Sequence, residues 1–310
     1  MIRIVSTLLA ASLLTPLADQ GQVRFRSEAE AVFVDVQARE RNRPIAGLTA
    51  ADFELRDSGV VQKIQAVATD DLPLTLMLAL DTSSSVRGAT LDHLKAAARG
   101  AVDALTGEDQ AALLTFNNRI SRATTATRDR AQLADAIAGM TARGTTSLVD
   151  VVFAATALRE NIGRVLLLVF TDGLDTISWL DPKDVLDSVL RSDLVAYTVS
   201  ISPQLAEATR ADAPSLARRR SILKRWFQTE PALFPQAFID ELTEQTGGES
   251  FFVRDGSELA PTFARIVSEF KSRYLLTYSP TGVPATGWHP IEVKLKNRRG
   301  SVQARRGYWR

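Results

Sequence analysis

The stretch of sequence that decides the fold is LTLMLALDTSSS, residues 74–85. Its first part, residues 74–80, is apolar except for Thr75. A nearly unbroken apolar run of this length is typical of a strand in a parallel sheet, where helices cover both faces. Polar residues begin abruptly at Asp81, so the sequence predicts a central strand whose carboxyl end opens into a polar loop.

Apolar strands and amphipathic helices alternate on the C-terminal side of this stretch. Further strands are predicted at 110–116, 164–170, 194–201 and 249–253, and helices at 91–105, 128–140, 149–160, 234–245 and 258–271, with another opening at Asp181-Pro182. Proline is favoured in the first turn of a helix, which supports the last of these. This alternation predicts an α/β fold with a doubly wound, mostly parallel, Rossmann-like sheet.

The two ends of the chain have a different pattern, in which apolar residues recur at every second position. This period of two covers residues 31–67 and returns from residue 274 onward, and it predicts antiparallel strands. Because chain termini commonly lie close together, we expect both ends to form one small β domain. The predicted division is a signal peptide at 1–20, a β segment at 21–72, an α/β domain at 73–272 and a second β segment at 273–310.

Within the α/β domain, residues 203–233 do not fit the alternation. They are rich in alanine and arginine, and they form either a solvated helical insertion or a lid over a ligand. The N-terminus combines Arg3, an apolar run and the small residue Ala18, which is typical of a secretory signal peptide. We therefore expect an exported chain, periplasmic or secreted, with no membrane span in its mature form.

The composition excludes several classes of function. Among 310 residues there are 37 Lys and Arg against 36 Asp and Glu, so the charge balance gives no reason to expect a nucleic acid partner. The absence of cysteine excludes thiol catalysis, disulfides and thiolate metal sites. With only His93 and His289 present, a histidine-rich zinc site is excluded as well.

Oxygen-bearing side chains follow three of the predicted elements. Asp81, Ser83 and Ser85 form a D-x-S-x-S motif after the first strand, Thr146 precedes a helix, and Asp172 follows another strand. In open parallel sheets, ligands bind beyond the carboxyl ends of the strands. Carboxylates and hydroxyls are hard ligands that suit Mg²⁺, Mn²⁺ or Ca²⁺.

This arrangement resembles the von Willebrand factor type A domain and its metal-ion-dependent adhesion site, over about residues 74–271. The flanks resemble those of exported von Willebrand A-related proteins common in acidobacteria, through AGLTAADF at 46–53 and YLLTYSP at 274–280. The resemblance implies that Ser83, Ser85 and Thr146 coordinate a divalent ion through their hydroxyls, while Asp81 and Asp172 supply negative charge. It further implies a protein partner that offers a Glu or Asp carboxylate to the ion, and a binding module rather than an enzyme.

Other interpretations stay open at this point. Ser85 and Thr146 are also suited to capping helices, and Asp172 to an ordinary turn. A metal-dependent hydrolase is the alternative among enzymes, although no general base is evident in the sequence. A scaffold with a purely structural metal is the third interpretation. Asp150, four residues after Thr146, is expected to be a helix cap or dipole partner rather than a ligand.

Overall fold

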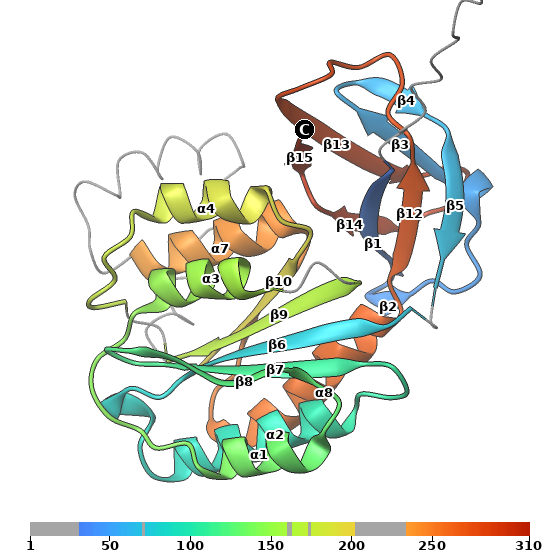
Figure 1. Cartoon of the computed structure of the whole chain (residues 1–310). Helices are drawn as coiled ribbons and strands as arrows, with labels where there is room; N and C mark the ends of the chain where they lie inside the picture. Colours follow the sequence, from blue (N-terminus) through green and yellow to red (C-terminus); the bar gives the residue numbers. More distant parts are fainter. Residues whose placement is uncertain (1–30, 70–71, 160–162, 173–174, 202–233) are drawn as a thin grey trace, which may run out of the picture.

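A computed structural model describes residues 31–69, 72–159, 163–172, 175–201 and 234–310 of the chain. Figure 1 shows two parts: an α/β domain, residues 74–271, and a smaller β module, formed by residues 31–69 and 274–310. The predicted signal peptide and the 203–233 insertion lie outside the described residues.

A mixed sheet forms the centre of the α/β domain. Its strand order is β11-β10-β9-β6-β7-β8, in which all neighbours are parallel except β7 and β8. Leu80 of the central strand stands opposite Phe170 on one side and Thr115 on the other, so three strands end at the same level. The strands are β6 (Leu74–Asp81), β7 (Gln110–Phe116), β8 (Ile120–Thr127), β9 (Arg164–Thr171), β10 (Val195–Ser200) and β11 (Ser250–Phe252).

Helices cover both faces of this sheet, as the apolar central strand predicts (Figure 1). Leu76, Leu78 and Leu80 pack toward α1, α2 and α8, whereas Met77 and Ala79 pack toward α3, α4 and α7. The alternation of side chains along a strand divides the core into these two layers. The helices are α1 (Ala89–Asp103), α2 (Arg130–Ala138), α3 (Leu148–Leu158), α4 (Pro182–Leu190), α7 (Phe234–Thr246) and α8 (Leu259–Lys271). None of the helices in the described ranges is long and apolar enough to cross a membrane.

The β module is a sandwich of antiparallel strands from both ends of the chain. One sheet has the order β14-β1-β12-β5 with β2 beside β1, and the other β15-β13-β3-β4. Val34 pairs with Leu276 and Leu55 with Val293, which confirms the predicted small β domain made from both segments. The strands are β1 (Val32–Glu40), β2 (Arg43–Pro44), β3 (Phe53–Asp57), β4 (Val60–Gln62), β5 (Ile64–Ala68), β12 (Tyr274–Tyr278), β13 (Trp288–Leu295), β14 (Ser301–Ala304) and β15 (Gly307–Trp309).

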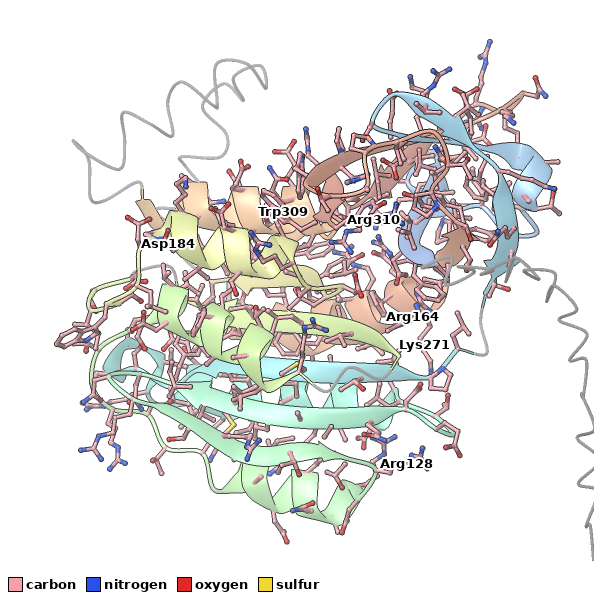
Figure 2. The ribbon with its side chains drawn as sticks, turned by 45° about the horizontal axis from the view of Figure 1, so that its top comes forward. Arg128, Arg164, Asp184, Lys271, Trp309 and Arg310 are labelled. Carbon is pink, nitrogen blue, oxygen red and sulfur yellow. The ribbon has the colours of Figure 1, made fainter. Side chains whose placement is uncertain are left out.

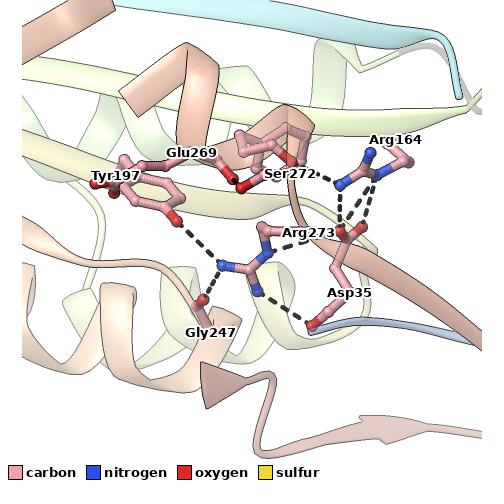
Figure 3. A network of polar contacts seen from close by, with 8 residues as sticks. Asp35, Arg164, Tyr197, Gly247, Glu269, Ser272 and Arg273 are labelled. Atoms are coloured by element: carbon pink, nitrogen blue, oxygen red, sulfur yellow. Dashed lines mark hydrogen bonds and ion pairs between the residues drawn. The ribbon is translucent and has the colours of Figure 1, made fainter. Parts of the chain in front are cut away.

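Buried arginines join the two parts, as Figure 3 shows. Arg164, the first residue of β9, donates to the Asp35 carboxylate at 2.7 Å and to the Phe270 carbonyl at 2.9 Å. The fully buried Arg273 donates to the Tyr197 hydroxyl at 3.1 Å and to the Asp35 carbonyl at 3.1 Å. Figure 2 shows Arg164 and Lys271 at the end of the sheet that faces the β module. The module therefore covers the amino ends of the strands and leaves their carboxyl ends free of it.

One strand was not expected from the sequence. Residues 120–127 form β8, which pairs with β7 at the edge of the sheet. Its sequence, ISRATTAT, is largely polar because most of its side chains are exposed or half-buried at this edge. Hydrophobic periodicity detects buried strands far better than exposed ones.

Candidate metal centre

Asp81 ends the central strand as a fully buried carboxylate. Its Oδ1 accepts from the backbone N–H of Ser83 at 2.8 Å, and its Oδ2 accepts from the Thr171 hydroxyl at 3.2 Å. Burial, and next the negative charge of Asp172, raise the pKa of the Asp81 carboxyl to about 7 despite these hydrogen bonds. The structure therefore brings the two predicted carboxylates close enough to repel each other.

Two serine hydroxyls stand beside this carboxylate. The Oγ atoms of Ser83 and Ser85 are 2.9 Å apart, at the start of a short 3-10 helix, Ser84–Val86. Ser83 occupies the N-cap position, yet its side chain makes no capping hydrogen bond. The D-x-S-x-S spacing thus places both hydroxyls together rather than using them to cap the helix.

Backbone hydrogen bonds attach the second loop to the first. The Ser84 N–H donates to the Gly144 carbonyl at 2.9 Å, and the Arg143 N–H donates to the Thr82 carbonyl at 2.7 Å. Gly144 has a φ of +77°, a left-handed conformation that favours glycine. This turn leads into Thr146, which is buried, so the second predicted loop lies against the first.

The Thr146 side chain is not a helix cap. Ser147 is the N-cap of α3, and even its hydroxyl donates elsewhere, to the Asn117 carbonyl at 2.7 Å. In the part of the chain that the structure describes, no hydrogen bond involves the Thr146 hydroxyl. The capping role that the sequence left open for Thr146 is therefore filled by other groups, and its hydroxyl is available to a ligand.

The third loop is joined to the second through the backbone of Thr146. Its carbonyl accepts from the N–H groups of Thr176 at 3.0 Å and Ile177 at 3.2 Å. The Asp175 carboxylate and the Ser178 hydroxyl accept from the Val149 N–H at 3.0 and 3.1 Å, at the start of α3. These contacts hold the segment that follows Asp172 against the loop that carries Thr146.

Asp150 completes this arrangement from the first turn of α3. Its carboxylate accepts from the N–H groups of Trp179 at 3.1 Å and Leu180 at 3.0 Å. It thus binds backbone N–H groups of the third loop instead of capping its own helix. Because Asp175, Thr176 and Ser178 act only through hydrogen bonds to the loops, no motif in the sequence identified them as part of the site.

The donor set fits a hard divalent cation. Asp81 is wholly buried, Asp172 is half-buried, and no lysine, arginine or histidine of the described ranges forms an ion pair with either. A buried carboxylate needs a compensating charge, which a cation supplies. Across the described residues no three His, Cys, Asp or Glu side chains group together.

The two histidines lie elsewhere. His289 is buried in the β module, with Nδ1 2.9 Å from the Asp57 carboxylate. His93 lies in α1, where its ring packs against Gly256. Neither hydrogen-bonds to the three loops described above.

The fold of the α/β domain is that of the von Willebrand factor type A domain. The sequence profile of that domain matches residues 76–174, which include all five candidate ligands. A search of the curated proteins finds no match in sequence.

Solved structures extend the likeness. A von Willebrand factor type A protein from Catenulispora acidiphila is 13% identical, with 88% of this chain and 74% of that chain covered and a TM-score of 0.51. Proximal thread matrix protein 1 from the mussel byssus, solved with a zinc-occupied adhesion motif, is 16% identical (69% and 50% covered, TM-score 0.49). The von Willebrand domain of a Porphyromonas gingivalis pilus tip protein is 22% identical (34% and 39% covered, TM-score 0.33). This chain thus spans half or less of the length of the last two proteins.

Proposed function

We propose that this protein is a binding module that recognises an acidic residue of a partner protein through a divalent metal ion. Asp81, Ser83, Ser85, Thr146 and Asp172 would hold the ion, which we expect to be Mg²⁺, with Mn²⁺ or Ca²⁺ as alternatives. The observation that carries this proposal is the buried Asp81 carboxylate, placed beside Asp172 without a cationic side chain in the described ranges. A divalent ion would relieve the repulsion between the two carboxylates.

The residues of the chain prepare this site before any ion binds. Thr171 and the Ser83 N–H orient the two Asp81 oxygens, and the paired hydroxyls of Ser83 and Ser85 already lie together. Mg²⁺ takes six oxygen ligands, so these five side chains would leave at least one coordination position open. A hard cation prefers a carboxylate to water, so a Glu or Asp of the partner would complete its coordination.

Export belongs to the same proposal. The N-terminal sequence is typical of a signal peptide, and the flanks resemble those of exported acidobacterial proteins, so we infer that the binding module acts in the periplasm or outside the cell. The division at residues 72/73 and 272/273, and the character of the 203–233 insertion, stay predictions.

Calorimetric titration of Mg²⁺ into the metal-stripped protein tests the proposal. We expect saturable binding to the wild type and none to Asp81→Ala, whereas Asp135→Ala should bind normally because Asp135 is exposed on α2. Equal binding to the wild type and Asp81→Ala would contradict the assigned site. If Mg²⁺ binds but Glu-containing peptides bind equally well in EDTA, the metal is structural and the bridging mechanism fails.

A further inference from the structure

We infer that the partner presents its metal-binding carboxylate within a segment that also carries an apolar side chain and a second carboxylate. This inference rests on the proposed function and extends it to the composition of the partner. It follows from two different surfaces that border the candidate metal centre, one apolar and one basic.

The apolar surface is formed by Trp179 and Leu180, together with Phe153 of α3. Phe153 lies three residues beyond Asp150, whose carboxylate accepts from the N–H groups of Trp179 and Leu180. Trp179 is 92% exposed, and Leu180 and Phe153 are 39% and 40% exposed. Single exposed apolar residues are ordinary, but an almost fully exposed indole, with further large exposed apolar residues on the same loop and the adjoining helix, is typical of a contact surface. Aromatic side chains, tryptophan above all, supply much of the binding energy of protein interfaces.

Hydrogen bonds attach the backbone of this surface to α3 and to Thr146. The Trp179 N–H donates to both oxygens of Asp150 at 3.1 Å, and the same segment donates to the Thr146 carbonyl through Ile177. A backbone that is already held by hydrogen bonds need not be ordered when a partner binds, which lowers the entropic cost of binding. Trp179 therefore belongs to a segment that is attached to the loop of a candidate metal ligand.

The basic surface is formed by Arg87, Arg119 and Arg143, which are all exposed. The Arg87 guanidinium donates to the Ser84 hydroxyl at 3.1 Å and to the Ala142 carbonyl at 3.4 Å, which places it over the first and second loops. The backbone N–H of Arg143 binds the Thr82 carbonyl at 2.7 Å.

Arg119 belongs to the neighbouring hairpin. Its N–H donates to the Asn117 side chain, whose amide donates to the Thr82 hydroxyl at 3.2 Å. Within the described part of the chain, none of these three arginines forms an ion pair. Three exposed arginines without an ion pair, on or beside the loops of a cation site, favour a partner with carboxylates beyond the one that binds the metal.

The ligand loops connect to both surfaces, because the first and second loops carry Arg87 and Arg143, and the Thr146 carbonyl accepts from the segment of Trp179. A partner segment whose carboxylate reaches the metal would extend over both. The partner that fits both surfaces is a protein segment with at least two acidic residues and an adjacent aromatic or aliphatic side chain.

Selection of a random peptide library on the full chain in Mg²⁺ tests this inference. We expect peptides enriched in Asp or Glu together with an aromatic or aliphatic residue, all of which are lost in EDTA and with Asp81→Ala. For Trp179→Ser we expect the selected peptides to stay enriched in Asp or Glu but to lose the apolar residue. The affinity of Trp179→Ser for the peptide that binds the wild type most tightly should be lowered roughly 10- to 30-fold. The double variant Arg87→Ser with Arg143→Ser should lose the second acidic position and keep the apolar one.

Trp309→Ser is the matched control, since Trp309 is 38% exposed but lies on the β module beside α4, where it packs against Arg191 (Figure 2). Mg²⁺ affinity should be unchanged in every variant except Asp81→Ala. If the wild type selects acidic peptides without apolar residues, or if Trp179→Ser selects the same peptides as the wild type, the inference is overturned. The metal-bridging function would still stand in either case. Peptides that bind equally in EDTA, or the absence of any Mg²⁺-dependent peptide, would overturn the proposed function itself.

Discussion

Replacing Asp81 by asparagine should stabilise the metal-free protein at neutral and higher pH. Asparagine has nearly the same shape, its carbonyl oxygen still accepts from the Ser83 N–H, and its amide group can donate to the Thr171 hydroxyl in place of the present bond. The substitution therefore removes the buried charge and keeps the hydrogen bonds.

The magnitude follows from the raised pKa. Burial, together with the charge of Asp172, raises the pKa of Asp81 from 3.8 to about 7, so the folded state holds a proton that the unfolded chain has already released. Protonation of Asp81 therefore adds to the free energy of unfolding of the wild type. This addition is complete below about pH 4 and is lost as the pH rises through about 7. At about 1.4 kcal/mol for each pKa unit, the free energy of unfolding of the wild type should fall, relative to Asp81→Asn, by about 3 kcal/mol between about pH 5 and pH 8.

Urea unfolding in EDTA at these two pH values measures this difference. Asp135→Asn, at an exposed position of α2, is the control and should follow the wild type at both pH values. Addition of Mg²⁺ should stabilise the wild type and leave Asp81→Asn unchanged. If the free energies of unfolding of Asp81→Asn and the wild type differ by the same amount at both pH values, the reasoning is refuted. The charge of Asp81 would then not destabilise the folded state.

Three further predictions concern two buried polar contacts and the turn at Gly144. Arg164→Ala should lower the free energy of unfolding in urea by about 3–5 kcal/mol, because it leaves the Asp35 carboxylate, which is 10% exposed, without its main partner. Arg128→Ala, at an exposed ion pair, is the control and should lower it by about 1 kcal/mol or less. Burial disfavours the Asp57 carboxylate, but hydrogen bonds from His289, Tyr278, Tyr308 and Ser58 outweigh it and lower its pKa. Asp57→Asn should therefore cost about 2 kcal/mol at neutral pH and progressively less below about pH 4, where the wild type loses this contribution; a pH-independent cost in denaturation curves would contradict this. Gly144 has a φ of +77°, and a Cβ there would meet the Asn118 side chain. Gly144→Ala should therefore lower the free energy of unfolding by about 1–2 kcal/mol and weaken Mg²⁺ binding in calorimetry. Gly139→Ala is the control and should do neither, since its Cβ would make only ordinary contacts at 3.5 and 3.6 Å.

The sequence predicts most of the fold because buried elements carry strong patterns. Residues 74–80 alone indicate a central parallel strand, and Asp181 with Pro182 marks the start of α4, where the Asp181 side chain accepts from the Lys183 N–H at 2.8 Å. The polar edge strand β8 shows no such pattern, and the sequence analysis missed it.

The candidate site could be predicted only in part. Asp81, Ser83 and Ser85 form a short local motif, and the shared carboxyl edge of β6 and β9 brings in Asp172. The groups that fix the loops are found only in three dimensions, as the hydrogen bonds that Asp150 accepts from the third loop show across 29 and 30 residues. The Asp57–His289 pair, separated by 232 residues, leaves no trace in local sequence either.

The most direct test of the central claim is thermal unfolding of the metal-stripped protein, titrated with Mg²⁺, Mn²⁺ and Ca²⁺ beside Asp81→Ala. At a hundred times the dissociation constant, binding should add ~2.7 kcal/mol, which corresponds to roughly 5–10 °C in Tm for a domain of this size. We predict a saturable rise in Tm for the wild type with at least one ion, and none for Asp81→Ala. An unchanged Tm with all three ions, or an equal rise in both proteins, would contradict a metal site at Asp81, Ser83, Ser85, Thr146 and Asp172.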